Sequence, residues 1–196
     1  MNIVKNVLST GAIGLVAGAA SAQLDVVLIV DISVANQITI SATSGVSAAT
    51  VSGSDTTGFY LADFFTSDGG GTFNDTLVAG DLTSAENTSD GSPLLFRGTF
   101  PALDTGLNVF TYTDDADSEF VAGNQAFSGS ATWTVDADDY ADILSANMSG
   151  TEFFPADTSD DIAAGAVAIG TYTVIPAPAS AALLGLGGLA AARRRR

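Results

Sequence analysis

The sequence has no cysteine and no histidine, and Lys5 is its only lysine. These absences exclude disulfides, thiol nucleophiles, catalytic triads that need an imidazole, and zinc sites built on imidazole or thiolate ligands. If the segment that contains Lys5 is removed, Schiff-base and Ser–Lys chemistry are excluded as well. We therefore predict that the protein is not an enzyme and needs no organic cofactor.

Positive charge is also scarce, with 6 Lys and Arg residues against 22 Asp and Glu residues. Lys5 lies near the start and four arginines end the chain, so Arg97 is the only basic residue of the long middle segment. Nucleic-acid binding needs a basic surface that displaces counterions, which excludes a nucleic-acid partner. An acidic excess of this kind keeps a protein soluble by self-repulsion and suits saline surroundings, where salt screens that repulsion.

The first 22 residues have the three parts of a secretory signal peptide. Lys5 supplies a positive start, residues 7–18 form an apolar stretch, and Ala20 and Ala22 are the small residues of a cleavage site. We predict that signal peptidase cleaves before Gln23. Residues 1–22 then form a signal helix that lies outside the fold, and the protein is exported.

The other end of the chain has the composition of a membrane span. Pro176 and Pro178 precede a run of Ala, Leu and Gly, which ends in the cluster Arg193, Arg194, Arg195 and Arg196. As a helix, residues 175–192 would be about 27 Å long, close to the roughly 30 Å of a bilayer's hydrocarbon core. The glycines and prolines make it a poor core helix of a soluble domain. We predict a transmembrane helix whose arginines stay in the cytoplasm.

The order of Pro176-Ala177-Pro178, apolar span and arginine cluster resembles the PEP-CTERM sorting signal of Gram-negative bacteria. That signal usually has Glu between its prolines, where this chain has Ala177. The resemblance is limited to residues 175–196. It implies recognition by an exosortase-like enzyme, cleavage near the Pro-x-Pro motif, a membrane-held intermediate, and a context of extracellular polysaccharide. It implies nothing about the activity of the preceding residues.

Residues 23–174 form the predicted folded domain, which is acidic and long enough for one apolar core. Apolar and hydroxyl residues alternate in segments 38–43, 110–113 and 131–135, which is typical of half-buried strands. Segment 26–30 is a continuous apolar run, as expected of a strand covered on both faces. Clusters of Gly, Asp and Ser separate such segments. We predict an all-β fold, with the strands arranged as an antiparallel β-sandwich or jelly roll.

One short helix is predicted in this domain, at residues 136–147. Asp136 is placed to cap its N-terminus, and Asp138 and Asp139 lie in its first turn. The buried face should comprise Tyr140, Ile143, Leu144 and Met148. In the last strand, Gly170 is expected at a β-bulge, where the apolar face of the strand changes.

Clustered carboxylates are the metal-ligand pattern of this chain, because Ca²⁺ prefers oxygen ligands. The predicted Ca²⁺ site lies in one loop and comprises Asp114, Asp115, Asp117 and Glu119. Similar clusters occur within residues 136–142 and 157–161. A divalent ion would relieve the repulsion within such a cluster. In so acidic a chain, ordinary solvated charge is the default interpretation of these clusters, and Ca²⁺ binding is the alternative.

Two residue types occur once in the folded domain. Trp133 lies on the apolar side of its strand and is expected in the core, whereas an exposed indole would serve to stack on a sugar. Arg97 is expected to pair with a carboxylate rather than to bind an anionic ligand.

From these patterns we expect an exported, non-enzymatic protein of the cell surface or extracellular matrix, held in the membrane by its C-terminal helix at least transiently. The alternative is a carbohydrate-binding module or a Ca²⁺-dependent adhesion module. A glycoside hydrolase that uses two carboxylates is a third hypothesis. Among 22 acidic residues, however, some pair lies close together by proximity alone, so the sequence gives no specific support for it.

Overall fold

The computed structural model describes residues 23–54, 58–72, 75–87, 94–97, 104–110 and 117–178. This part of the chain forms twelve strands and two short helices. In chain order they are β1 (Val26–Asp31), β2 (Gln37–Ala42), β3 (Val51–Ser54), β4 (Phe59–Leu61), β5 (Gly71–Thr72), β6 (Asp75–Ser84), β7 (Leu94–Arg97), β8 (Leu107–Phe110), β9 (Asp117–Phe120), β10 (Phe127–Val135), α1 (Ala137–Ile143), β11 (Ser149–Phe154), α2 (Ser159–Ala164) and β12 (Val167–Ile175).

The prediction of a mostly β fold is confirmed. The strands expected at 26–30, 38–43 and 131–135 correspond to β1, β2 and β10. Of the strand expected at 110–113, only residue 110 is described, and it is the last residue of β8. The apolar run in β1 is not covered throughout, because Val26 is 42% exposed.

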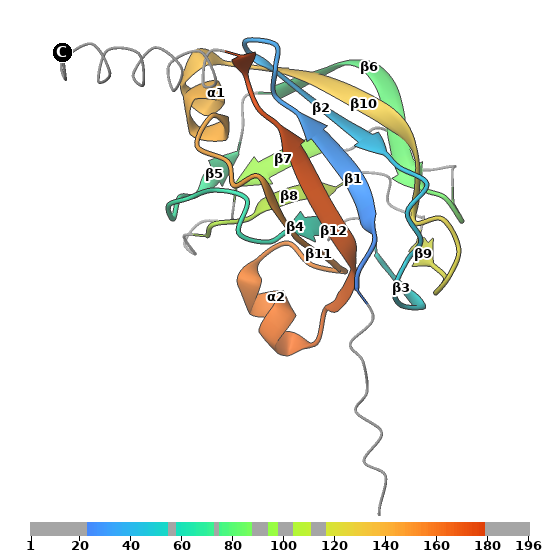
Figure 1. Ribbon diagram of the computed structural model, residues 1–196. Coiled ribbons are helices and arrows are strands. Elements are labelled where there is room, and N and C mark those ends of the chain that lie inside the picture. The colour runs from blue at the N-terminus through green and yellow to red at the C-terminus, as the bar shows by residue number, and fades with distance from the viewer. Residues whose placement is uncertain are drawn as a thin grey trace, which may run out of the picture.

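Ten of the strands belong to one sheet, in the order β5-β7-β8-β4-β11-β12-β1-β2-β10-β6. This sheet curls into a nearly closed barrel (Figure 1), as expected when many twisted strands share one sheet. Near the gap, the Asp75 carboxylate in β6 accepts a hydrogen bond from the backbone N–H of Leu95 in β7, at 3.3 Å. β3 and β9 form a separate ribbon. The strands are thus joined into one curled sheet, and not into the two facing sheets of a sandwich.

β1 and β12 lie side by side in the middle of the large sheet and run parallel. The other strand pairs of the described residues are antiparallel. Because β1 and β12 point the same way, the chain enters the barrel at one end, where β1 begins, and leaves it at the opposite end, where β12 stops (Figure 1).

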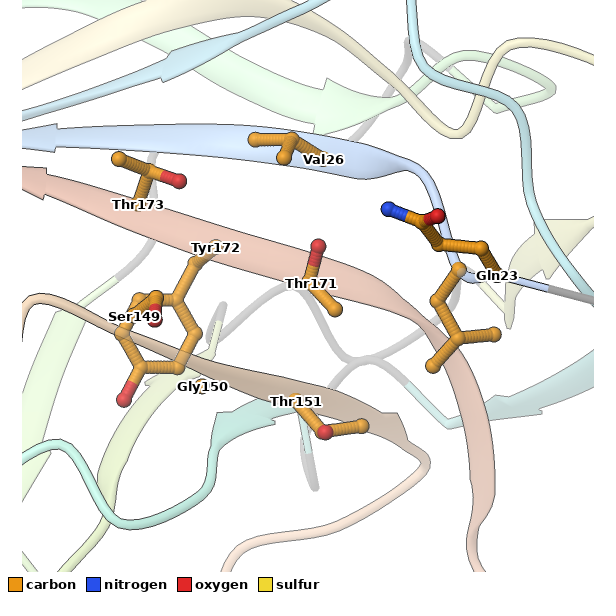
Figure 2. A pocket seen from close by; sticks show the side chains of 9 residues that line it. Gln23, Val26, Ser149, Gly150, Thr151, Thr171, Tyr172 and Thr173 are labelled. Carbon is orange, nitrogen blue, oxygen red and sulfur yellow. The ribbon is translucent and has the colours of Figure 1, made fainter.

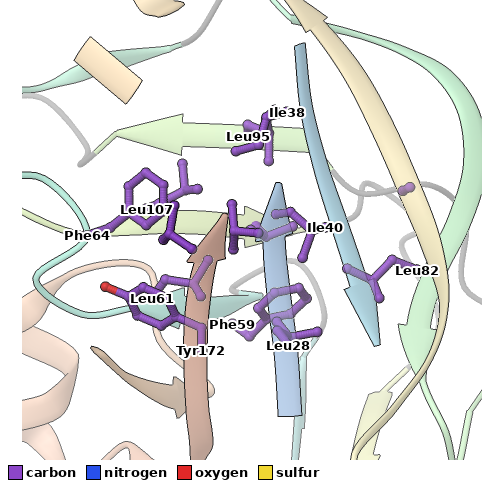
Figure 3. Close-up of a cluster of buried hydrophobic side chains, with 14 of the residues drawn as sticks. Leu28, Ile38, Ile40, Phe59, Leu61, Phe64, Leu82, Leu95, Leu107 and Tyr172 are labelled. Atoms are coloured by element: carbon purple, nitrogen blue, oxygen red, sulfur yellow. The ribbon is translucent and has the colours of Figure 1, made fainter. Parts of the chain in front are cut away.

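The interior of the barrel is filled by apolar side chains from β1, β2, β4, β6, β7, β8 and β12 (Figure 3). Trp133 in β10 is fully buried, which confirms its predicted place in the core. Hydroxyl residues alternate with the core residues and face outward. On β2 and β10, the hydroxyl oxygens of Thr39 and Thr132 lie 2.8 Å apart, as do those of Ser41 and Ser130. Such cross-strand pairs add to the pairing of neighbouring strands.

The predicted N-cap of α1 is present. The Asp136 carboxylate accepts hydrogen bonds from the N–H groups of Asp138 and Asp139, at 3.0 and 2.9 Å. The helix buries Tyr140, and its hydroxyl donates to the carbonyl of Ile32 at 2.8 Å. α1 therefore covers the end of the barrel at which β1 stops.

The predicted extent of this helix is wrong. α1 ends at Ile143, and Leu144 and Met148, expected on its buried face, are 43% and 50% exposed. The chain leaves the helix early because Ser149 already begins β11, which pairs with β12. The sequence pattern does not predict α2, since six residues are too few to show a helical period.

The expected irregularity near Gly170 is present as a shift of register between β11 and β12. Gly170 faces Glu152, whereas Ala168 already faces Phe153, so one residue of β12 has no partner. A Cβ atom on Gly170 would lie 2.5 Å from a methyl group of Val27. Glycine at this position therefore lets β12 approach a core side chain of β1.

A carboxyl group lies within the apolar interior beside this irregularity. Glu152 is fully buried, and neither of its side-chain oxygens has a hydrogen-bond partner among the residues that the structure describes. Burial raises the pKa of the Glu152 carboxyl well above its ordinary value of 4.5, because a charge without a partner is unstable in an apolar interior. The native barrel therefore favours the protonated, neutral form of Glu152 more strongly than the unfolded chain does.

We expect Glu152 to lower the stability of the protein as the pH rises. Above about pH 4.5 the unfolded chain releases this proton, whereas the native barrel keeps it until the pH reaches the raised native pKa of Glu152. Between these two pKa values, the free energy of unfolding falls by up to about 1.4 kcal/mol per pH unit. Glu152→Gln should remove this slope, and Glu152→Met should stabilise the protein at pH 7 by about 1–3 kcal/mol. Urea unfolding across this pH range measures both effects.

The matched control is Glu119→Gln, which changes an exposed residue of β9 and should leave the pH dependence as it is. If Glu152→Gln retained the full slope of the wild-type protein, the assignment of that slope to Glu152 would be wrong.

Candidate functional site

The outer side of β11 and β12 carries a pocket lined by small hydroxyl side chains (Figure 2). Thr151 faces Thr171 in the strand register, and Ser149 faces Thr173, so the four residues form one compact block. The pocket has a volume of about 520 Å³, which lies within the range of small-molecule sites.

None of the described residues that line this pocket is charged, although the domain is rich in Asp and Glu. The backbone N–H and the hydroxyl of Thr171 both donate to the carbonyl of Asp25, at 2.8 and 3.0 Å. The hydroxyl oxygen of Thr171 therefore still has lone pairs to accept a hydrogen bond. Val26, which is exposed, adds an apolar wall. Tyr172 contributes no free hydroxyl, because this group donates to the carbonyl of Ala62 at 2.9 Å.

Neutral groups that both donate and accept hydrogen bonds, beside an apolar wall, suit an uncharged polyhydroxylated ligand such as a saccharide unit. Gln23 adds an amide at the edge of the pocket (Figure 2). The sequence pattern does not predict this site. Each strand alone shows only the ordinary alternation of a half-buried strand, and only the register of β11 against β12 brings the hydroxyls together.

The predicted Ca²⁺ site falls largely outside the described residues. Asp114 and Asp115 are not described, and of Asp117 only the backbone is described, where it pairs with Ser54 in the ribbon of β3 and β9. Glu119 is exposed and lines a small pocket of about 240 Å³. Within the described ranges, no three potential ligands are grouped closely enough to hold a metal ion.

The cluster at residues 136–142 has structural partners. Asp136 caps α1, and Asp142 forms an ion pair with Arg97, which confirms the carboxylate partner predicted for that arginine. A guanidinium N–H of Arg97 also donates to the carbonyl of Ser67 at 2.7 Å, and the guanidinium carbon lies 4.2 Å from the centre of the Phe65 ring. Arg97 therefore joins β7, the segment after β4, and α1, with its side chain almost fully buried.

A second anchoring group is Asp104, a buried residue that the sequence does not single out. Its carboxylate accepts hydrogen bonds from the Tyr60 hydroxyl and from the N–H groups of Ser159 and Gly106, the last two at 2.7 and 3.2 Å. Burial by itself opposes ionisation, but these donors outweigh it and lower the pKa of Asp104 below its ordinary value. Asp104 thus ties the start of α2 to the barrel.

The cluster at residues 157–161 lies at the start of α2. The Asp161 carboxylate accepts hydrogen bonds from the N–H groups of Asp157 and Thr158, at 3.0 and 3.2 Å, which is the arrangement of a capping box. Burial raises the pKa of Asp157 from its ordinary 3.8 to about 6, with a further contribution from its hydrogen bond to Asp161. The two carboxyl groups therefore share a proton in mildly acidic solution.

The residues of the two predicted sorting segments lie mostly outside the described part, which excludes Ala20, Ala22 and the arginine cluster 193–196. Pro176 and Pro178 are described and exposed. Ala177, at the position where the PEP-CTERM motif has Glu, is 6% exposed. Among the residues that the structure describes, neither helix has the length and apolar character needed to cross a bilayer.

Replacement of Asp161 by Asn should lower the pKa of Asp157 from about 6 towards 3.8, because it removes the neighbouring negative charge and the shared proton. The amide oxygen of Asn can still accept the capping hydrogen bonds, so α2 should remain folded. Carboxyl ¹³C chemical shifts followed against pH measure this value directly. Asp160→Asn, in the same turn, is the control and should leave the Asp157 titration near pH 6. An unchanged titration in Asp161→Asn would show that burial alone raises the Asp157 pKa.

Comparisons with protein-family models, with curated proteins and with solved structures find no match for this chain.

Proposed function

We propose that this chain is an exported, non-enzymatic protein of the cell surface or extracellular matrix, processed by signal peptidase and by an exosortase-like enzyme. The observation that supports this proposal best is where the folded domain begins and ends. β1 starts at Val26, soon after the predicted cleavage site, and β12 stops at Ile175, directly before Pro176. Removal of residues 1–22 and of the residues after Ile175 leaves both central strands complete, since Ile175, counted with the sorting segment in the sequence, belongs to β12.

The place of β12 in the sheet also favours a membrane-held intermediate. β12 pairs with β11 on one side and with β1 on the other, so the sheet is continuous only after the chain up to Ile175 is available. A membrane-embedded tail that follows β12 directly would hold the chain on the outer side of the membrane while the barrel completes. Release by cleavage near Pro176 would then free a finished domain.

The charge of the folded domain fits an exported protein in saline surroundings. Arg97 is only 7% exposed and pairs with Asp142, so it contributes little positive charge to the surface. The acidic side chains are therefore balanced mainly by dissolved cations, and their mutual repulsion keeps the released domain soluble.

Intact mass measured on protein from the medium should show a chain that lacks both residues 1–22 and the arginine cluster. A mass that retains residues 193–196 in all fractions would mean a permanent anchor and would contradict processing by an exosortase-like enzyme.

Deletion of residues 179–196 should move the protein from the cell envelope to the medium. Its free energy of unfolding should stay within about 0.5 kcal/mol of that of the processed protein, since all described residues remain. Unchanged retention at the cell surface would contradict the sorting role of the tail.

A second candidate function, carbohydrate binding, is favoured by the pocket on β11 and β12. Stacking of a sugar on Trp133 is excluded, because this side chain is fully buried. The pocket offers hydroxyl groups of Thr151, Thr171 and Thr173 instead, without a charged neighbour in its lining. A neutral segment of extracellular polysaccharide is the ligand that this lining fits.

For this function, Thr151→Val and Thr171→Val should each weaken binding of a neutral glucan about fivefold, which corresponds to one lost hydrogen bond of about 1 kcal/mol. Thr134→Val, on β10 and outside the pocket, is the isosteric control. Calorimetric titration with dextran measures these affinities. The same titration with added Ca²⁺ tests whether binding depends on a metal ion. Equal affinity of all three variants and the wild-type protein would rule out the pocket as the binding site.

A further inference from the structure

One end of the barrel is formed by segments that lie far apart in the sequence. The last residue of β1, Asp31, faces the last residue of β12, Ile175, and the chain then turns from β1 into β2. The end of β10 leads into α1, which covers this end of the barrel, and the start of β11 lies beside the end of β12. We call this end the tail pole: residues 32–36, α1 with residues 144–148, and residues 175–178.

Large apolar side chains are exposed at the tail pole. Val34 in the turn after β1 is 55% exposed, Leu144 and Met148 after α1 are 43% and 50% exposed, and Ile175 at the end of β12 is 43% exposed. Of the large exposed apolar residues in the described part, the others are Val26, Val46 and Val78, which lie elsewhere on the domain. Exposed apolar side chains that gather on one face mark a surface for a partner.

The path of the chain beyond β12 indicates the partner. The carbonyl of Ile175 accepts a hydrogen bond from the N–H of Ile32 at 3.0 Å, which fixes the last residue of the strand. Ala177 is nearly buried, so the short segment after the strand is itself seated on the domain. Residues 176–178 can span at most about 10 Å even when fully extended. A tail that enters a bilayer just after Pro178 therefore brings the tail pole to the lipid surface.

The charges at this pole decide which lipid it fits. Asp136 and Asp138 are exposed on α1, and Asp142 pairs with Arg97. Exposed carboxylates such as those of Asp136 and Asp138 repel anionic headgroups over about 8 Å at physiological salt, whereas zwitterionic headgroups impose no such cost. Side chains such as Met148 and Leu144 can then enter the boundary between headgroups and acyl chains, where interfacial apolar residues are buried by about 5–10 Å.

We infer that the tail pole is a membrane-contacting surface, which a zwitterionic bilayer covers as long as the C-terminal segment is embedded. The inference rests on the proposed function, in that it requires the tail to enter the membrane. The opposite end of the barrel, where β1 begins and Val46 is exposed, then points away from the membrane. Cleavage near Pro176 uncovers the apolar side chains of the tail pole at the moment of release.

Because the chain has no cysteine, a single introduced cysteine can carry a polarity-sensitive fluorophore without further changes. Met148→Cys places the label at the tail pole, and Val46→Cys is the matched control at the opposite end, on a similarly exposed apolar residue. The full chain is reconstituted into phosphatidylcholine vesicles with brominated acyl chains, and flotation establishes whether it is bound. We expect emission from the Met148→Cys label to shift to shorter wavelength and to be quenched by the brominated lipid, and emission from the Val46→Cys label to stay unchanged.

Four outcomes of this experiment would each contradict a different part of the proposal. A chain that does not float with the vesicles would overturn the embedded tail and with it the membrane contact. A chain that floats while the Met148→Cys label remains unquenched would overturn the inference and leave the proposed tail anchor standing. A label already shielded without vesicles would show that a second copy or the tail itself covers this pole, which also overturns the inference. Equal or stronger quenching with an anionic phospholipid in place of phosphatidylcholine would overturn the choice of neutral headgroups.

Leu144→Cys provides a second position at the same pole if Met148→Cys fails to fold, and it should give the same shift and quenching. In the protein that lacks residues 179–196, both labels should keep their emission unchanged when the same vesicles are added. A label that was quenched by the vesicles without the tail would show that the contact does not depend on the embedded segment.

Discussion

The parallel pairing of β1 with β12 is the interaction on which the rest of the structure depends. It joins the two ends of the folded chain at the middle of the large sheet, so that without β12 the strands β4 and β11 are separated from β1 and β2. The entropy of closing so long a loop is lost in forming this pair, and the barrel can be completed only when the last strand is available. The same pairing places the beginning and the end of the domain at opposite ends of the barrel.

Charge is arranged around this barrel in an unusual way. The one arginine of the domain is buried and joins three segments, while Glu152 is buried in apolar surroundings that raise the pKa of its carboxyl. Acidic side chains with structural partners, such as Asp104 and Asp161, accept backbone hydrogen bonds at helix starts and turns. Because carboxylates without a cationic partner are stable mainly in water, most of the acidic side chains that the structure describes lie at the surface. Dissolved salt screens the repulsion between them.

The two surfaces with chemical character differ in kind. The pocket of β11 and β12 is neutral and hydroxyl-lined, whereas the tail pole combines apolar side chains with the carboxylates of α1. A protein that is first held at a membrane and later meets polysaccharide would use these surfaces in succession. In the proposed arrangement, three residues after β12 would hold the acidic domain close to the bilayer, and its apolar end would face the lipid until the tail is cleaved.

The sequence by itself determined four features of this domain. Its β-rich character and the core position of Trp133 follow from local periodicity, and the cap of α1 by Asp136 follows from local hydrogen bonding. The carboxylate partner of Arg97 follows from the scarcity of basic residues. Only the tertiary structure decided that the strands form one curled sheet, that Leu144 and Met148 are exposed, and that Thr151 faces Thr171. These features depend on which strands pair and in what register. Pairing between distant segments is governed by how all of them fit around a shared core, which no local pattern records.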